Sequence, residues 1–401
     1  MNPTSPLPAI AALLVAVATS FFLAKQFGAP PIAGRNASID GLRGYLAFFV
    51  FLHHSCVWYF YLETGQWNSP PSNLYTHFGQ SSVAVFFMIT GFLFFSKLIE
   101  GRTRTIDWGK LFVSRFLRLA PLYFFAMFLL FLVVALLSNG VVAVPTAQLM
   151  KEVASWLGFA LLGAPDLNGV EHTSYIIARV TWSLRYEWFF YLSLPILAVA
   201  VGVRPPRAYI ALGVGSLLAL LMWHPEIPHL LSFLGGIAAS ILVRSDVFRQ
   251  FARGRIASLL ILACVLATVV FYPSAYELAP LALLSVAFAL IACGNNLFGL
   301  LVSTVSHFLG EMAYGIYLLH GIVLFVVFNF IIGLPESRAL SSEMHWLLVA
   351  GITPFLLVFC FTAFRLIERP AMQSSTRCTA WLRSRLTTRS KRVAASNVPL
   401  N

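Results

Sequence analysis

Gly44-Tyr-Leu-Ala-Phe-Phe-Val-Phe-Leu-His-His-Ser-Cys-Val-Trp-Tyr-Phe-Tyr-Leu62 is the stretch that decides the fold. Its apolar residues follow one another and do not alternate with polar ones. A transmembrane helix needs roughly 17–25 residues that are mostly apolar. The stretch therefore predicts a helix that crosses a membrane, and it directly follows Arg43, a charge that suits the membrane edge.

Ten further runs of this kind follow or precede it, so we expect eleven transmembrane helices. They cover residues 8–24, 44–62, 82–99, 119–138, 186–203, 208–223, 229–243, 256–272, 277–293, 307–330 and 345–366. A shorter run at 152–163 predicts a re-entrant or interfacial helix. The 8–24 run differs from a secretory signal peptide because its basic residue, Lys25, follows it, and we interpret it as a retained helix.

The composition supports this interpretation. Of 401 residues, 59% are hydrophobic and 10% are charged, whereas soluble domains have about 45–50% apolar and about 25% charged residues. The mean hydropathy is +0.82. These values exclude a soluble globular enzyme and a disordered chain, and five cysteines exclude a disulfide-stapled module. Continuous apolar runs disfavour a β-barrel, so the predicted fold class is an all-α polytopic membrane protein.

The basic residues predict the orientation. With the N-terminus outside, only Lys151, Arg179, Arg185 and Arg338 lie in outer segments, and the other 23 of 27 Lys and Arg residues lie inside. The net charge of +12 then reflects this bias and a basic tail near anionic lipid, and no nucleic-acid partner is expected. We expect an N-terminal helix and cytoplasmic linker at 1–37, a membrane domain at 38–370 and a flexible or surface-bound cytoplasmic tail at 371–401.

Arg43 and His54 are the first candidates for a functional site. They are eleven residues apart, so on a helix they point off one face within about 20°, with His54 about 16 Å deeper. His53 points elsewhere. An ionisable residue inside a membrane span is costly and is a functional candidate by default. Arg43 is either a basic flank or a ligand-binding residue, and His54 is either a packing residue or a general base.

Three other groups of residues could serve the same site. Arg115 and Arg118 share a helix face and suit phosphate groups, or they form a basic flank. Glu187 follows Trp182 at a helix start, where it favours the helix, binds an acceptor hydroxyl or orients His54. The remaining candidates are supporting or acceptor-binding residues, namely Asp40, Trp182, Ser183, Tyr314, Tyr317 and His320.

Several stretches together resemble the bacterial integral-membrane acyltransferases of acyltransferase family three. The stretches, in chain order over about residues 38–370, are Ile39–Gly44 with His54, Phe86–Phe92, Arg115–Arg118, Trp182–Leu184 with Glu187, Tyr314–His320 and Leu366–Pro370. The family pattern Trp-Ser-Leu-Ser-Val-Glu-Glu differs from Trp182-Ser-Leu-Arg-Tyr-Glu-Trp188, which keeps one carboxylate. The helix at 8–24 precedes the usual start and resembles an addition to a ten-helix core.

The resemblance implies transfer of an acyl group, most simply acetyl, from cytoplasmic acyl-CoA to a sugar hydroxyl of a cell-surface or secreted glycan. Arg43, Arg115 and Arg118 would bind the donor, His54 would be the general base, and Glu187 would assist. It implies a bacterial cytoplasmic membrane and no permanently bound cofactor. No metal is expected, because His53 and His54, adjacent on a helix, point about 100° apart and make a poor chelating pair. A transporter or flippase of a lipid-linked sugar or acyl intermediate is the alternative, and it would bind no CoA at Arg115 and Arg118.

Overall fold

The computed structural model describes residues 2–28 and 36–396, and for residues 386–396 it describes the backbone only. The described chain is helical, with one isolated bridge between Leu167 and Val170 as its only β pairing. The predicted fold class, an all-α polytopic membrane protein, is confirmed.

Within residues 2–28 and 36–396, six helical segments are long and apolar enough to cross a membrane, or seven if a bent pair is counted as one span. The six are α1 (Pro6–Phe27), α2 (Ala37–Thr64), α3 (Asn73–Glu100), α4 (Trp108–Leu137), α13 with η3 (Ala313–Ile331) and α15 with η4 and α16 (Ser342–Gln373). The bent pair is α8 (Ile227–Leu242) and α9 (Asp246–Ala252), which meet at 110°.

The other elements are too short or not apolar enough to count as spans by themselves. They are α5 (Thr146–Leu157), η1 (Thr173–Ile177), α6 (Thr181–Ala200), α7 (Arg207–Met222), α10 (Arg255–Phe271), α11 (Leu278–Ala292), η2 (Leu300–Val302), α12 (Thr304–Glu311), α14 (Leu334–Arg338) and α17 (Ser375–Ser396). Each of the eleven predicted runs falls on a helix, while the number of actual spans stays a prediction.

Two predicted elements differ from the structure in their limits. The run at 307–330 is broken at Met312, so α12 and α13 are separate helices. The short helix expected at 152–163 is α5, which starts earlier, after Pro145, and ends at Leu157. Positive φ angles at Phe159 (60°) and Ala160 (50°) follow, and a helix does not continue through such residues.

Helix α2 lies at the centre of the bundle and packs against α3, α12 and α13. Its Phe48 and Phe51 are completely buried. Near its N-terminus it approaches α12 so closely that a Cβ atom on Gly310 would collide with the carbonyl oxygen of Asp40. This contact fixes the end of α2 that carries Asp40 and Arg43.

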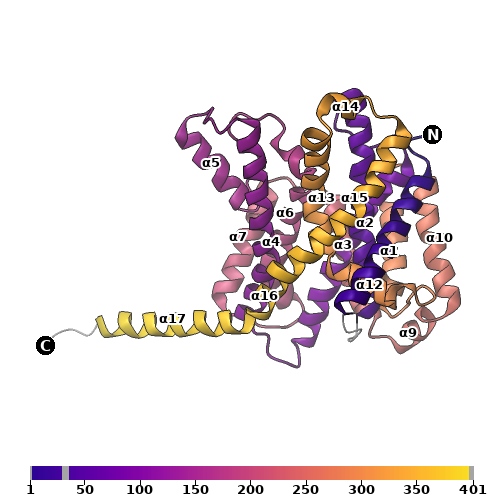
Figure 1. Cartoon of the computed structure of the whole chain (residues 1–401). Helices are drawn as coiled ribbons and strands as arrows, with labels where there is room; N and C mark the ends of the chain where they lie inside the picture. The colour runs from indigo at the N-terminus through magenta and orange to yellow at the C-terminus, as the bar shows by residue number, and fades with distance from the viewer. Residues whose placement is uncertain (1, 29–35, 397–401) are drawn as a thin grey trace.

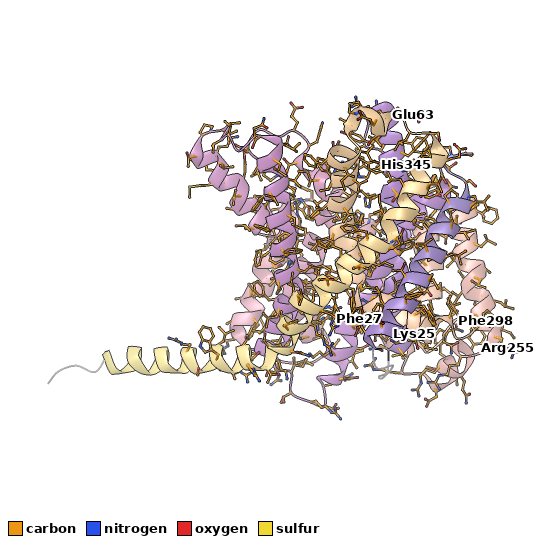
Figure 2. The ribbon with its side chains drawn as sticks, viewed as in Figure 1. Lys25, Phe27, Glu63, Arg255, Phe298 and His345 are labelled. Atoms are coloured by element: carbon orange, nitrogen blue, oxygen red, sulfur yellow. The ribbon has the colours of Figure 1, made fainter. Side chains whose placement is uncertain are left out.

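The two termini lie at opposite ends of the bundle, and α17 leaves it crosswise at the C-terminal end (Figure 1). Lys25 and Arg255 lie at the end with α17, whereas Glu63 lies at the other (Figure 2). The tail, expected to be flexible or surface-bound, thus begins as a helix. Arg383 of α17 pairs with Asp107, whose pKa is lowered by a hydrogen bond from the Lys110 N–H and then by Arg383. The sides of the membrane stay a prediction.

The close approach of α2 and α12 generates a prediction. In Gly310→Ala the added methyl group must push the helices apart, and overpacking of this kind costs about 1–3 kcal/mol. We expect a lower thermal unfolding midpoint in detergent, followed by the loss of monodispersity on heating. Gly215→Ala on α7 is the matched control, since a Cβ there meets no atom within 4 Å. Equal midpoints for Gly310→Ala and wild type would contradict this packing.

Candidate active site

A cavity of about 260 Å³ opens between α2, α3, α4, α6 and α13. Its charged lining residues come from three different helices and are Asp40, Arg43, Arg115, Arg118 and Glu187. Three guanidinium groups thus face two carboxylates, which leaves a formal excess of positive charge. We call this space the arginine cavity, and its charge suits a ligand that carries phosphate or another anion.

Contacts within the arginine cavity hold its charged groups in place. Glu187 accepts hydrogen bonds from the Thr90 hydroxyl (3.4 Å) and from the Tyr191 hydroxyl (3.3 Å). The Arg115 guanidinium lies over the Phe94 ring, 5.2 Å from its centroid. The Arg118 guanidinium approaches the Met372 sulfur at 3.5 Å. Weak contacts to a ring and a sulfur leave most of the hydrogen-bonding capacity of these two guanidiniums for a ligand.

A second cavity, of about 200 Å³, lies next to the first, and we call it the histidine cavity. Its lining residues are Val50, His53, His54, Gly79, Gln80, Val83, Val180, Trp182, Tyr276 and Tyr317. Val83 and Tyr317 line both cavities, so the two spaces meet at these side chains. The Tyr317 hydroxyl lies 2.6 Å from the Ser183 hydroxyl and donates to the Val180 carbonyl at 3.2 Å.

The hydrogen bonds of His54 and His320 determine which nitrogen of His54 is a base. His320 Nδ1 lies 2.8 Å from the Ile316 carbonyl, which can only accept, so this nitrogen carries the proton. Nε2 of neutral His320 then accepts from His54 Nδ1 at 3.0 Å. His54 Nδ1 also lies 3.1 Å from the Val50 carbonyl. The proton of neutral His54 is therefore on Nδ1, and its Nε2 keeps a lone pair.

The structure distributes the predicted residues over the two cavities. Arg43 and His54, predicted to share a face of α2, line cavities that meet. On α6, Trp182 lines the histidine cavity and Glu187 lines the arginine cavity. Glu187 therefore lies in the same cavity as the arginines. It accepts hydrogen bonds from Thr90 and Tyr191 and not from His54. Of the three roles considered for Glu187, direct orientation of His54 finds no hydrogen bond in the described residues.

Ser183, Tyr314 and Tyr317 line the arginine cavity, as does Asp40. The Tyr314 hydroxyl donates to the Leu119 carbonyl at 3.0 Å, which ties α13 to α4. His320 lines neither cavity and is connected to the site by its hydrogen bond with His54.

Sequence reasoning missed several residues that line these cavities. His53, expected to point elsewhere, lines the histidine cavity and donates to the Tyr75 carbonyl at 2.8 Å. Gln80 and Tyr276 also line it and carry no sequence signal of their own. Thr90 lies within the Phe86–Phe92 stretch that carried the resemblance, which could have indicated it.

Fold and site together define a polytopic membrane protein with a polar site inside its helical bundle. A family model described as an acyltransferase domain, that of acyltransferase family 3, matches residues 36–365. The chain belongs to this family and is a membrane acyltransferase. Helix α1 precedes the matched region, and its interpretation as an addition to the family core stays a prediction. No curated protein and no solved structure matches the chain.

The histidine hydrogen bonds generate a prediction that needs no substrate. Nitrogen NMR of protein with isotope-labelled histidine, in nanodiscs at neutral pH, is expected to show His54 with a protonated Nδ1 and an unprotonated Nε2. The spectrum of His54→Asn identifies the resonances that belong to His54. A proton on Nε2 of His54 would contradict the assignment.

Proposed function

We propose that this acyltransferase moves an acyl group, most simply acetyl, from cytoplasmic acyl-CoA to a sugar hydroxyl of a cell-surface or secreted glycan. One observation carries the proposal: a cavity lined by arginines meets a cavity lined by histidines at Val83 and Tyr317. We further propose that the protein lies in a bacterial cytoplasmic membrane with its C-terminus in the cytoplasm. The donor then approaches from one side and the glycan from the other.

The arginine cavity is the proposed donor site. The phosphate groups of CoA carry negative charge, and paired guanidinium groups bind phosphate through two parallel hydrogen bonds. Arg115 and Arg118 are one helical turn apart on α4, and Arg43 faces them from α2. With the phosphates held there, the pantetheine arm points toward Tyr317 and carries the thioester to the junction of the cavities.

The histidine cavity is the proposed acceptor site. Trp182 and Tyr276 offer aromatic surface, and Gln80 offers an amide, a combination that suits a sugar with its apolar ring faces and hydroxyl edges. The Gln80 carbonyl accepts from the Ser274 hydroxyl and the Ala275 N–H, both at 2.9 Å, which orients the amide. A lipid-linked saccharide would present its sugar in the same way.

His54 is the proposed general base. Its Nε2 takes the proton of the sugar hydroxyl while the sugar oxygen attacks the thioester carbonyl carbon. The carbon–sulfur bond breaks, and the proton passes from His54 to the CoA thiolate, so an ester and free CoA are formed. His320 is a positioning residue in this step, because its Nε2 holds His54 in the tautomer that leaves the other nitrogen basic.

His54→Asn tests the base. Hydrolysis of labelled acetyl-CoA, with water as acceptor, is expected to fall by about 10²–10⁴ in rate, whereas the affinity for acetyl-CoA stays within about twofold. His224→Asn is the matched control, because His224 is exposed and lies away from both cavities. Wild-type hydrolysis in a monodisperse His54→Asn protein would remove His54 from the mechanism.

The double variant Arg115→Ala/Arg118→Ala tests the donor site. Each hydrogen bond to a charged group contributes about 1.5–3 kcal/mol, so the affinity for acetyl-CoA is expected to fall at least about tenfold. Arg102→Ala/Arg104→Ala, in the exposed turn before α4, removes the same charge and is expected to bind as wild type does. If the wild-type protein bound no acyl-CoA, the proposed function would be wrong, and flux of a lipid-linked sugar in proteoliposomes would be measured instead.

A further inference from the structure

A third cavity, of about 200 Å³, lies beside the arginine cavity and shares Asp40, Arg43 and Arg118 with it. Its other walls come from α12, η4 (Phe364–Glu368) and α16 (Arg369–Gln373). Their residues in the lining are His307, Gly310, Glu311, Phe364, Glu368 and Met372. Helices α12 and α16 lie toward the end of the bundle from which α17 leaves (Figure 1). The cavity is therefore on the side from which the donor is proposed to approach.

Glu368 is the first unusual residue of this cavity. It ends the π-helical turn η4, and only 2% of its surface is exposed. Within the part of the chain that the structure describes, its Oε1 has no hydrogen-bond partner. A buried carboxylate oxygen without a donor is costly, and such an atom calls for a ligand or another explanation. Glu368 lies in the Leu366–Pro370 stretch, to which the proposed mechanism gives no role.

His307 is the second unusual residue of this cavity. It lies in the first turn of α12, is 6% exposed and lines the same cavity. Its Nε2 is also without a hydrogen-bond partner among residues 2–28 and 36–396. Two buried polar residues on different elements thus line one small space: an ionised Glu368 can only accept hydrogen bonds, and His307 can donate or accept.

The charges around this space indicate which part of a donor fits it. Arg43 and Arg118 stand between the two cavities, so phosphate groups bound to them lie at the boundary. Beyond that boundary, Glu368 repels a further phosphate and accepts hydrogen bonds from neutral N–H or O–H groups. The adenine ring of an acyl-CoA provides such a group, its exocyclic amine, and ring nitrogens that accept from His307. The 3′-phosphate on the ribose would stay at the boundary with Arg43 and Arg118.

We propose that Glu368 and His307 form a subsite for the adenosine end of the acyl-CoA donor, separate from the phosphate contacts of Arg43 and Arg118. This inference rests on the proposed function. It gives the Leu366–Pro370 stretch a binding role outside the region matched by the family model. It also requires that removal of the adenosine from the donor removes the contribution of Glu368.

Two thioester probes separate this subsite from the rest of the donor site. Acetyl-CoA contains adenosine, and S-acetyl-4′-phosphopantetheine lacks it while keeping a phosphate and the acyl arm. The affinity of each probe would be measured calorimetrically with protein in nanodiscs. In Glu368→Leu we expect the affinity for acetyl-CoA to fall about tenfold and the affinity for S-acetyl-4′-phosphopantetheine to stay within twofold. Glu368→Gln, which preserves shape and one acceptor, is expected to lose less.

Glu63→Leu is the matched control, since it removes an exposed carboxylate at the opposite end of the bundle (Figure 2). Equal loss of affinity for both probes in the Glu368 variants would overturn the subsite and indicate a structural role. Unchanged affinity for both would overturn it as well. If the wild-type protein bound neither probe, the proposed function itself would fail, and that result is distinct from the other two.

Discussion

The structure depends on one constraint: charged side chains must be kept inside a bundle whose outer surface is apolar. A guanidinium or carboxylate placed in hydrocarbon is costly, so it persists only where other helices enclose it with partners or polar space. Arg43, Arg115, Arg118 and Glu187 come from three helices and face one cavity. Helices α2, α4 and α6 are therefore arranged so that they enclose these charged side chains.

Helix α2 connects this polar space to the chemistry. Its N-terminal turns carry Asp40 and Arg43, and its middle carries His54. A rigid helix holds such residues at fixed separation, and the contact with Gly310 sets the position of its end. Two other helices are broken near this polar space: the interruption at Met312 separates α12 from α13, and the π-helical turn η4 ends at Glu368, which lines the neighbouring cavity.

Much of the fold could be predicted from the sequence because an apolar run and a helix register are local properties. The predicted runs all fall on helices. Arg43 and His54, predicted to share one face of a helix, line two cavities that adjoin each other. Orienting His54 was one of three roles considered for Glu187, but its hydrogen-bond partners are Thr90 on α3 and Tyr191 on the next turn of α6. The lone pair of His54 depends on His320, 266 residues away. Spacing along one helix carries no information on such contacts.

The hydrogen bond between the Ser183 and Tyr317 hydroxyls has a consequence if the protein lies where it is proposed to lie. A bacterial cytoplasmic membrane carries an electrical potential, and moving one charge through 100 mV corresponds to about 2.3 kcal/mol. A continuous column of water through the bundle would conduct protons and discharge that potential. The two hydroxyls lie 2.6 Å apart and tie α6 to α13 where the cavities meet, beside the apolar Val83. Under the proposed function, this narrow junction would keep such a column from forming, so that reactants from two sides of the membrane could meet without a proton leak.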